Sequence, residues 1–273
     1  MQKSLLVPID FTEVTENALI YAIPLAKRLE AGVILLNYAK SKSEVDQSKE
    51  KLDALAKKHA DSGVSITSYA EVGGIKSMGS FAKDNNAGLI VMGTHGLKGI
   101  QYLVGSKALT VIANSEVPFV VVQNLPEKQS FNEIVVPIDF VSEEKVVLGS
   151  ASKFAKALGA RLRIIAAHYK DESLAEKVRL NLSFAKRFLK GGDVPFAIDV
   201  VPGKQSFEDE IMEFAKSIDA DLIGLVNHRE DGYKNLFGKN FDQNILTNDL
   251  KIPVFIFTAK KVSDLRDIFM MFS

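Results

Sequence analysis

One pattern occurs twice in this sequence, and the repeat limits the possible folds more than any other feature. Residues 6–11 read Leu-Val-Pro-Ile-Asp-Phe and residues 135–140 read Val-Val-Pro-Ile-Asp-Phe, so Asp139 follows Asp10 by 129 positions. Farther along, Ala-Asp-Leu-Ile at residues 220–223 corresponds to Ala-Gly-Leu-Ile at an offset of 133. This self-similarity predicts two tandem copies of one domain, joined by a linker near residues 123–132.

Within each copy, strand patterns alternate with helix patterns. Apolar runs in the first copy predict buried strands at residues 4–9, 33–38, 64–72, 89–92 and 117–122. The segment between the first two strands carries apolar residues at the three- and four-residue spacing of an amphipathic helix. Strands that alternate with helices in this way predict an α/β fold with a doubly wound parallel sheet.

The composition excludes several classes of function. The 273 residues include 34 basic and 34 acidic side chains, so no charge excess points to nucleic acid as a partner. There is no cysteine, which excludes disulfides and thiolate chemistry, and the four histidines lack metal-ligand spacing. The N-terminus runs directly into a strand, and no apolar run reaches the roughly 20 residues of a membrane-spanning helix. We therefore expect a cytoplasmic protein without a metal site or a membrane contact.

In the first copy, a strand, a loop with glycines and a helix start follow one another. The apolar run Leu89–Met92 precedes Gly93 and Gly96, and Gly105-Ser106 opens the next helix. Glycines can take positive φ and let a ligand approach the bare backbone, and free N–H groups at a helix start favour an anion. The arrangement indicates a phosphate-binding loop, although many βα loops use glycine for geometry alone.

Together these motifs resemble the universal stress protein family. They are a strand ending in Val-Pro-Ile-Asp, a strand ending in Met-Gly-Thr-His-Gly, a Gly-Ser at a helix start and a last strand Val-Pro-Phe-Val-Val-Val. The resemblance covers nearly the whole chain as a tandem pair. It implies two parallel five-stranded sheets of order 3-2-1-4-5, the adenine-nucleotide alpha-hydrolase-like fold. We expect domains at residues 1–124 and 132–260 and an apolar tail at residues 261–273.

The resemblance also implies a nucleotide site in the first copy, since some members of the family bind ATP and others do not. Nucleotide binders carry Gly-x-x-Gly, nine residues and Gly-Ser, whereas eight residues separate Gly96 from Gly105 here. Asp10 would bind ribose hydroxyls, although an aspartate at a strand end can equally be a turn or helix-cap residue. The positions carried over for ATP, with Mg²⁺ as a companion ion, are Pro8, Ile9, Asp10, Tyr38, Met92, Gly93, His95, Gly96, Gly105, Ser106 and Lys107.

The second copy keeps the fold pattern but alters the loop. At the offset of 133, Gly93 corresponds to Val226 and Gly96 to Arg229. A β-branched valine resists positive φ, and its side chain fills space that a phosphate needs. We expect that the second copy does not bind ATP in the manner of the family, although Arg229 and Lys239 could bind another anion.

The last strand of each copy suggests how the two copies associate. Residues 117–122 and 252–257 are apolar throughout, and edge strands of this kind are sticky unless another strand covers them. We expect the two strands to pair and make the chain an intramolecular pseudo-dimer, with further homo-oligomers open. The apolar tail is expected to pack on the body or to mark a partner surface.

Three functions are open from the sequence. The leading prediction is a cytoplasmic stress-response protein that binds ATP or a related nucleotide in its first copy and acts as a sensor or regulator through an unknown protein partner. The second is a nucleotide-free interaction scaffold. The third is slow ATP hydrolysis, for which no general base is evident, so no catalytic residue is assigned. P-loop, dinucleotide and serine-hydrolase motifs are not matched; Asn240, for example, stands where a P-loop needs Ser or Thr.

Overall fold

The chain divides into two compact units, residues 1–129 and 130–273. A computed structural model describes residues 3–94, 111–112, 115–126, 128–138, 144–227, 245–246 and 248–258. The predicted phosphate loop from residue 95 onward, its counterpart from residue 228 onward and the apolar tail lie outside these residues. None of the described helices is long and apolar enough to span a membrane.

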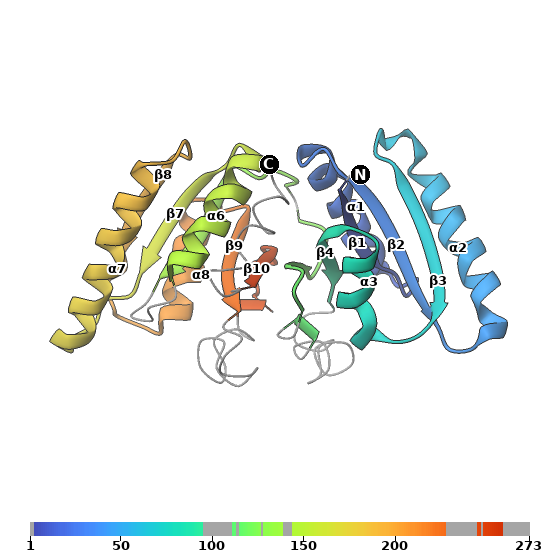
Figure 1. Cartoon of the computed structure of the whole chain (residues 1–273). Helices are drawn as coiled ribbons and strands as arrows, with labels where there is room; N and C mark the ends of the chain where they lie inside the picture. Colours follow the sequence, from blue (N-terminus) through green and yellow to red (C-terminus); the bar gives the residue numbers. More distant parts are fainter. Residues whose placement is uncertain are drawn as a thin grey trace. The chain divides into compact units, whose positions relative to one another are not determined.

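The first unit contains one parallel sheet with helices packed against it (Figure 1). Its strands are β1 (Ser4–Pro8), β2 (Gly32–Ala39), β3 (Ile66–Val72), β4 (Ala87–Gly93) and β5 (Phe119–Val122). They stand in the order β3-β2-β1-β4-β5, and all pair in parallel. The α/β fold and the strand order 3-2-1-4-5 predicted from the sequence are therefore confirmed for this unit.

The helices of the first unit follow from this strand order. Among the described residues they include α1 (Glu13–Arg28), α2 (Val45–Lys58) and α3 (Met78–Asp84), with 3₁₀ turns η1 (Lys42–Glu44), η2 (Ala60–Ser62) and η3 (Ile75–Ser77). Right-handed crossovers place α1 and α2 on one face and α3 on the other, because the chain reverses direction across the sheet between β3 and β4. This reversal opens a crevice at the carboxyl ends of β1 and β4, where ligands of open α/β sheets bind.

The second unit repeats the topology. Its strands are β6 (Glu133–Ile138), β7 (Arg161–Ala166), β8 (Phe196–Val200), β9 (Leu222–Asn227) and β10 (Val254–Thr258). Within this unit they stand in the order β10-β9-β6-β7-β8, which is the first unit's order read from the other side. The pairing of the last strands of the two copies stays a prediction.

In the part of the unit that the structure describes, helices connect the strands from β6 to β9. They are α6 (Glu144–Leu158), α7 (Glu172–Lys190) and α8 (Phe207–Ser217) (Figure 1). Helix α7 is 19 residues long, whereas its counterpart α2 has 14. The sequence motifs singled out neither α7 nor β8.

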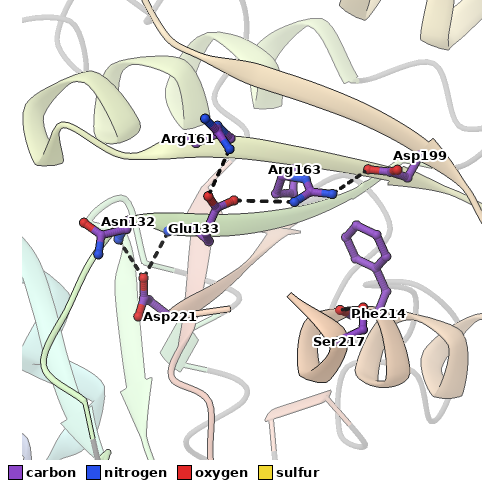
Figure 2. Close-up of polar contacts among 8 residues, drawn as sticks. All are labelled: Asn132, Glu133, Arg161, Arg163, Asp199, Phe214, Ser217 and Asp221. Atoms are coloured by element: carbon purple, nitrogen blue, oxygen red, sulfur yellow. Dashed lines mark hydrogen bonds and ion pairs between the residues drawn. The ribbon is translucent and has the colours of Figure 1, made fainter. Parts of the chain in front are cut away.

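A cluster of charges on the second sheet distinguishes the two units (Figure 2). The Arg163 guanidinium lies between two carboxylates, with Nη1 3.8 Å from Glu133 Oε2 and Nη2 3.1 Å from Asp199 Oδ2. It also lies over the ring of Phe214 on α8, 5.1 Å from the ring centroid. The strand register aligns Glu133, Arg163 and Asp199 with Ser4, Ile34 and Tyr69 of the first unit.

In the first unit, aromatic side chains form the contact at the corresponding place. There, Tyr69 of β3 packs edge-to-face on Phe81 of α3, with ring centroids 5.6 Å apart. In the second unit, the ring at the aligned position in α8 instead meets an arginine. Arg163 Nε and Glu133 Oε2 are buried without a hydrogen bond within the described part of the chain. The charge cluster therefore replaces an apolar contact, and its buried polar atoms do not all have a hydrogen-bond partner among the described residues.

Candidate functional site

A pocket lies in the first unit at the crevice where the strand order reverses. It has a volume of about 140 Å³ and is bounded by the carboxyl ends of β1, β2 and β4 and by the start of α3. The sequence-predicted site residues that line it are Pro8, Ile9, Asp10, Tyr38, Met92 and Gly93. The other predicted residues, His95, Gly96, Gly105, Ser106 and Lys107, lie outside the described residues.

The turn between β1 and α1 holds the Asp10 carboxylate at the pocket. Asp10 Oδ1 accepts hydrogen bonds from the Thr12 backbone N–H at 3.0 Å, from the Thr12 hydroxyl at 2.5 Å and from the Thr15 hydroxyl at 2.9 Å. Phe11 adopts a left-handed φ of 66°, which costs about 1–2 kcal/mol for a residue with a side chain. Asp10 thus acts as a turn residue through Oδ1, while no hydrogen bond from the described residues reaches Oδ2. The second oxygen can therefore accept a ligand hydroxyl.

Asn37 is a site residue that sequence reasoning missed. It lines the pocket from β2, is 8% exposed, and its Nδ2 donates to the Ile9 carbonyl oxygen at 2.7 Å. This bond orients the amide, and its Oδ1 accepts no hydrogen bond from the described part of the chain. Buried amides normally use their acceptors, so Oδ1 is suited to a ligand donor such as an exocyclic amine. A single polar residue in the apolar run 33–38 was the signal that could have identified it.

Tyr38 forms the side of the pocket next to the edge of the sheet. Its ring packs against the backbone of Gly73, where a Cβ would lie 2.8 Å from Tyr38 Cδ1. Ser77 Oγ donates to the Tyr38 hydroxyl oxygen at 3.1 Å. Burial raises the pKa of the Tyr38 hydroxyl, the Ser77 hydrogen bond lowers it, and the charge of Glu71 raises it. The phenol is therefore neutral at physiological pH and offers a ligand an uncharged, fixed ring.

Gly93 ends β4 where this strand passes closest to α1. A Cβ at Gly93 would lie 2.4 Å from the Val14 carbonyl oxygen and 2.9 Å from Val14 Cγ1. Gly93 does not use a positive φ, which was one of the two reasons for glycine considered from the sequence. The glycine is needed here because the backbone of α1 leaves no room for a side chain.

The remaining walls are mostly apolar. They come from Leu36, Ile75 and Met78, with the buried Thr15 beside Asp10. Pockets that enclose a whole drug-sized ligand measure roughly 300–1,000 Å³. The described residues therefore line only a part of such a site, with a flat apolar slot and polar groups at Asp10 and Asn37. This chemistry suits an aromatic ring with amine and hydroxyl groups.

Comparison with known proteins identifies the first unit. The sequence profile of the Universal stress protein family matches residues 1–123. The first unit belongs to this family. The match covers the strands and the pocket described above, so the resemblance stated from the motifs is confirmed. A comparison with curated proteins gave no match.

Solved structures extend the likeness to both units. A universal stress protein from Archaeoglobus fulgidus DSM 4304 superposes with a TM-score of 0.70 at 20% identity, over 93% of this chain and 98% of its own. A functionally unknown protein from Pseudomonas aeruginosa PAO1 gives a TM-score of 0.65 at 18% identity, over 99% and 95% of the two chains. At these identities the likeness shows the fold alone, and it supports the tandem arrangement.

Proposed function

We propose that the first unit binds an adenine nucleotide, ATP or a related compound, and that the chain acts as a cytoplasmic stress-response sensor or regulator. The observation that supports this proposal is the pocket at the carboxyl ends of β1 and β4. It combines an apolar slot with Asp10 Oδ2 and Asn37 Oδ1, neither of which accepts a hydrogen bond from the residues that the structure describes. Membership of the first unit in the universal stress protein family is in line with it.

Each wall has a role in this proposal. The base lies in the slot between Tyr38 and Met78, with its amine near Asn37 Oδ1, and the ribose hydroxyls bind Asp10 Oδ2. The phosphates extend toward the loop that follows β4, where Gly96, Gly105 and Ser106 would bind them together with Mg²⁺. The second unit does not take part, because valine and arginine replace the loop glycines there.

Calorimetric titration of the whole chain with ATP and Mg²⁺ tests the proposal, with Asp10→Asn as the decisive variant. Asparagine keeps Oδ1 as an acceptor for the turn, but it removes the charge and puts an amide in place of Oδ2. A hydrogen bond to a charged group is worth about 1.5–3 kcal/mol, so we expect binding roughly 10- to 100-fold weaker. Asp61→Asn, an exposed substitution at the opposite edge of the sheet, is the matched control and should leave the affinity unchanged.

The ligand can be varied in parallel. If Asp10 binds the ribose diol, 2′,3′-dideoxy-ATP should bind weakly to the wild type, and Asp10→Asn should weaken it no further. One site per chain is expected. If neither ATP, AMP nor adenosine produces heat, the nucleotide proposal fails and the interaction scaffold becomes the better reading. Two equivalent sites per chain would contradict the assignment to the first unit.

A further inference from the structure

The second unit carries a groove that the proposed nucleotide site does not use. It has a volume of about 580 Å³ and lies between α7 and β8, with the loop after β7 at one end. This volume falls within the roughly 300–1,000 Å³ typical of small-molecule sites. Of its lining residues, only Ala167 corresponds to a pocket residue of the first unit, Tyr38, at the offset of 129.

The groove exists because α7 does not pack against β8 in the way that α2 packs against β3. In the first unit, Leu52 of α2 is fully buried, and Lys49 Nζ donates to Ser68 Oγ of β3 at 3.1 Å, which ties the helix to that strand. Helix α7 instead leans on α6, where a Cβ at Gly149 would lie 4.0 Å from Phe188 Cζ. The space above β8 is therefore left open to a ligand.

Apolar side chains form the two long walls. Phe196, Ile198 and Val200 alternate along β8 toward the groove, while Asp199 between them points to the other face and pairs with Arg163. The helix contributes an apolar stripe that includes Val178 and Leu182. Val200 is 56% exposed, so the wall leaves apolar surface in water that an occupant would cover.

Apart from Tyr169 and Ser183, the polar side chains that line the groove are of basic residues. They are Arg179, Lys186 and His168, and none of the groove's lining residues is acidic. Arg179 pairs with Glu176 on its own helix, but a guanidinium has five donors and can bind a second carboxylate. Lys186 has no ion-pair partner within the described ranges. Because Lys186 follows Arg179 by seven positions, both lie on the groove side of α7, two turns apart.

A close backbone contact fixes the third basic residue. Gly203, with a left-handed φ of 69°, packs so tightly that a Cβ there would lie 3.0 Å from the His168 carbonyl oxygen. The loop after β7 is thereby held at the end of the groove. The groove is an apolar trough with two cations, Arg179 and Lys186, on its helix side, which complements a molecule with an apolar body and one negative group.

We propose that this groove binds an aliphatic carboxylate, with the ligand's hydrocarbon chain along β8 and its carboxylate between Arg179 and Lys186. The inference is independent of nucleotide binding by the first unit. Burial of the ligand's hydrocarbon chain against the two apolar walls supplies most of the affinity. The two cations select an anion over a neutral or cationic molecule of the same length.

A tryptophan introduced into the groove provides a local fluorescence signal, since the protein contains no other tryptophan. In the full chain with Phe196→Trp, decanoate should change the tryptophan emission saturably, decan-1-ol should bind more weakly and decyltrimethylammonium weakest. Calorimetry of decanoate with the wild-type chain checks that the reporter has not created the site. Ser183→Trp, at a lining residue that is exposed on α7, should fill the groove and abolish binding in the calorimeter.

Paired charge variants test the role of the two cations, Arg179 and Lys186. Arg179→Gln with Lys186→Gln should weaken decanoate about five- to ten-fold, as expected for two exposed ion pairs, and leave decan-1-ol unchanged. Lys177→Gln with Arg187→Gln removes the same charge from exposed positions of the same helix outside the groove and should have no effect. The proposal is overturned if decanoate does not bind saturably, if decan-1-ol binds as tightly, or if both pairs of variants weaken binding equally.

Discussion

The close contact between Gly93 and α1 gives a sharp prediction about stability. In Gly93→Ala, the new Cβ would stand 2.4 Å from the Val14 carbonyl oxygen, so β4 or the first turn of α1 must move by about 1 Å to restore an ordinary contact of 3.4 Å or more. Overpacking of this kind costs about 1–3 kcal/mol, and a weakened hydrogen bond in the helix adds about 0.5–1.5 kcal/mol. We expect the free energy of unfolding to fall by about 2–4 kcal/mol.

Urea unfolding of the full chain, followed by far-ultraviolet circular dichroism, measures this loss. Gly74→Ala is the matched control, because a Cβ at Gly74 meets no atom within 4 Å and its φ of −165° is ordinary extended backbone. The control should stay within about 0.5 kcal/mol of wild type. A Gly93→Ala protein as stable as Gly74→Ala would refute the argument from close approach. The two units can unfold separately, so the transition of the first unit is the one to compare.

Further predictions concern the second sheet and the pocket tyrosine. Arg163→Met leaves the Asp199 carboxylate without its cation and the partly buried Glu133 with only the more exposed Arg161, and it should destabilise the second unit by about 1–3 kcal/mol in urea unfolding. Glu133→Ser/Arg163→Ile/Asp199→Tyr, which copies the first unit, should be far less harmful than Arg163→Met; an equal loss would contradict the packing argument. Ser77→Ala removes the hydrogen bond that lowers the pKa of Tyr38, so an NMR titration should show that pKa rising further; an unchanged value would exclude the bond. Because burial already raises the pKa above its usual 10.0, the stability that Tyr38 contributes is full below about pH 10 and is lost as the pH rises through the folded-state value.

The residues that line the pocket can be compared with those predicted from the sequence. Asp10 and Tyr38 were predicted from the resemblance to the universal stress protein family, and both lie near the carboxyl ends of neighbouring parallel strands, where such sheets bind ligands. Asn37 and Met78 were missed, since a pocket wall depends on which side chains turn inward and on how α3 crosses the sheet. The role of Asp10 in the turn, with Oδ1 accepting three hydrogen bonds and Oδ2 accepting none from the described residues, is likewise invisible in a list of residues.

The sequence by itself determined the tandem repeat and the α/β class, because these depend on periodicity and on motifs that recur along the chain. The strand order was implied by the resemblance of those motifs to the universal stress protein family. Only the tertiary structure decided that Gly93 is required by the backbone of α1 and not by a positive φ. It also decided that α7 leans on α6 and opens a groove over β8, whereas α2 closes onto β3. Both outcomes depend on distances between segments far apart in the chain, which no local pattern encodes.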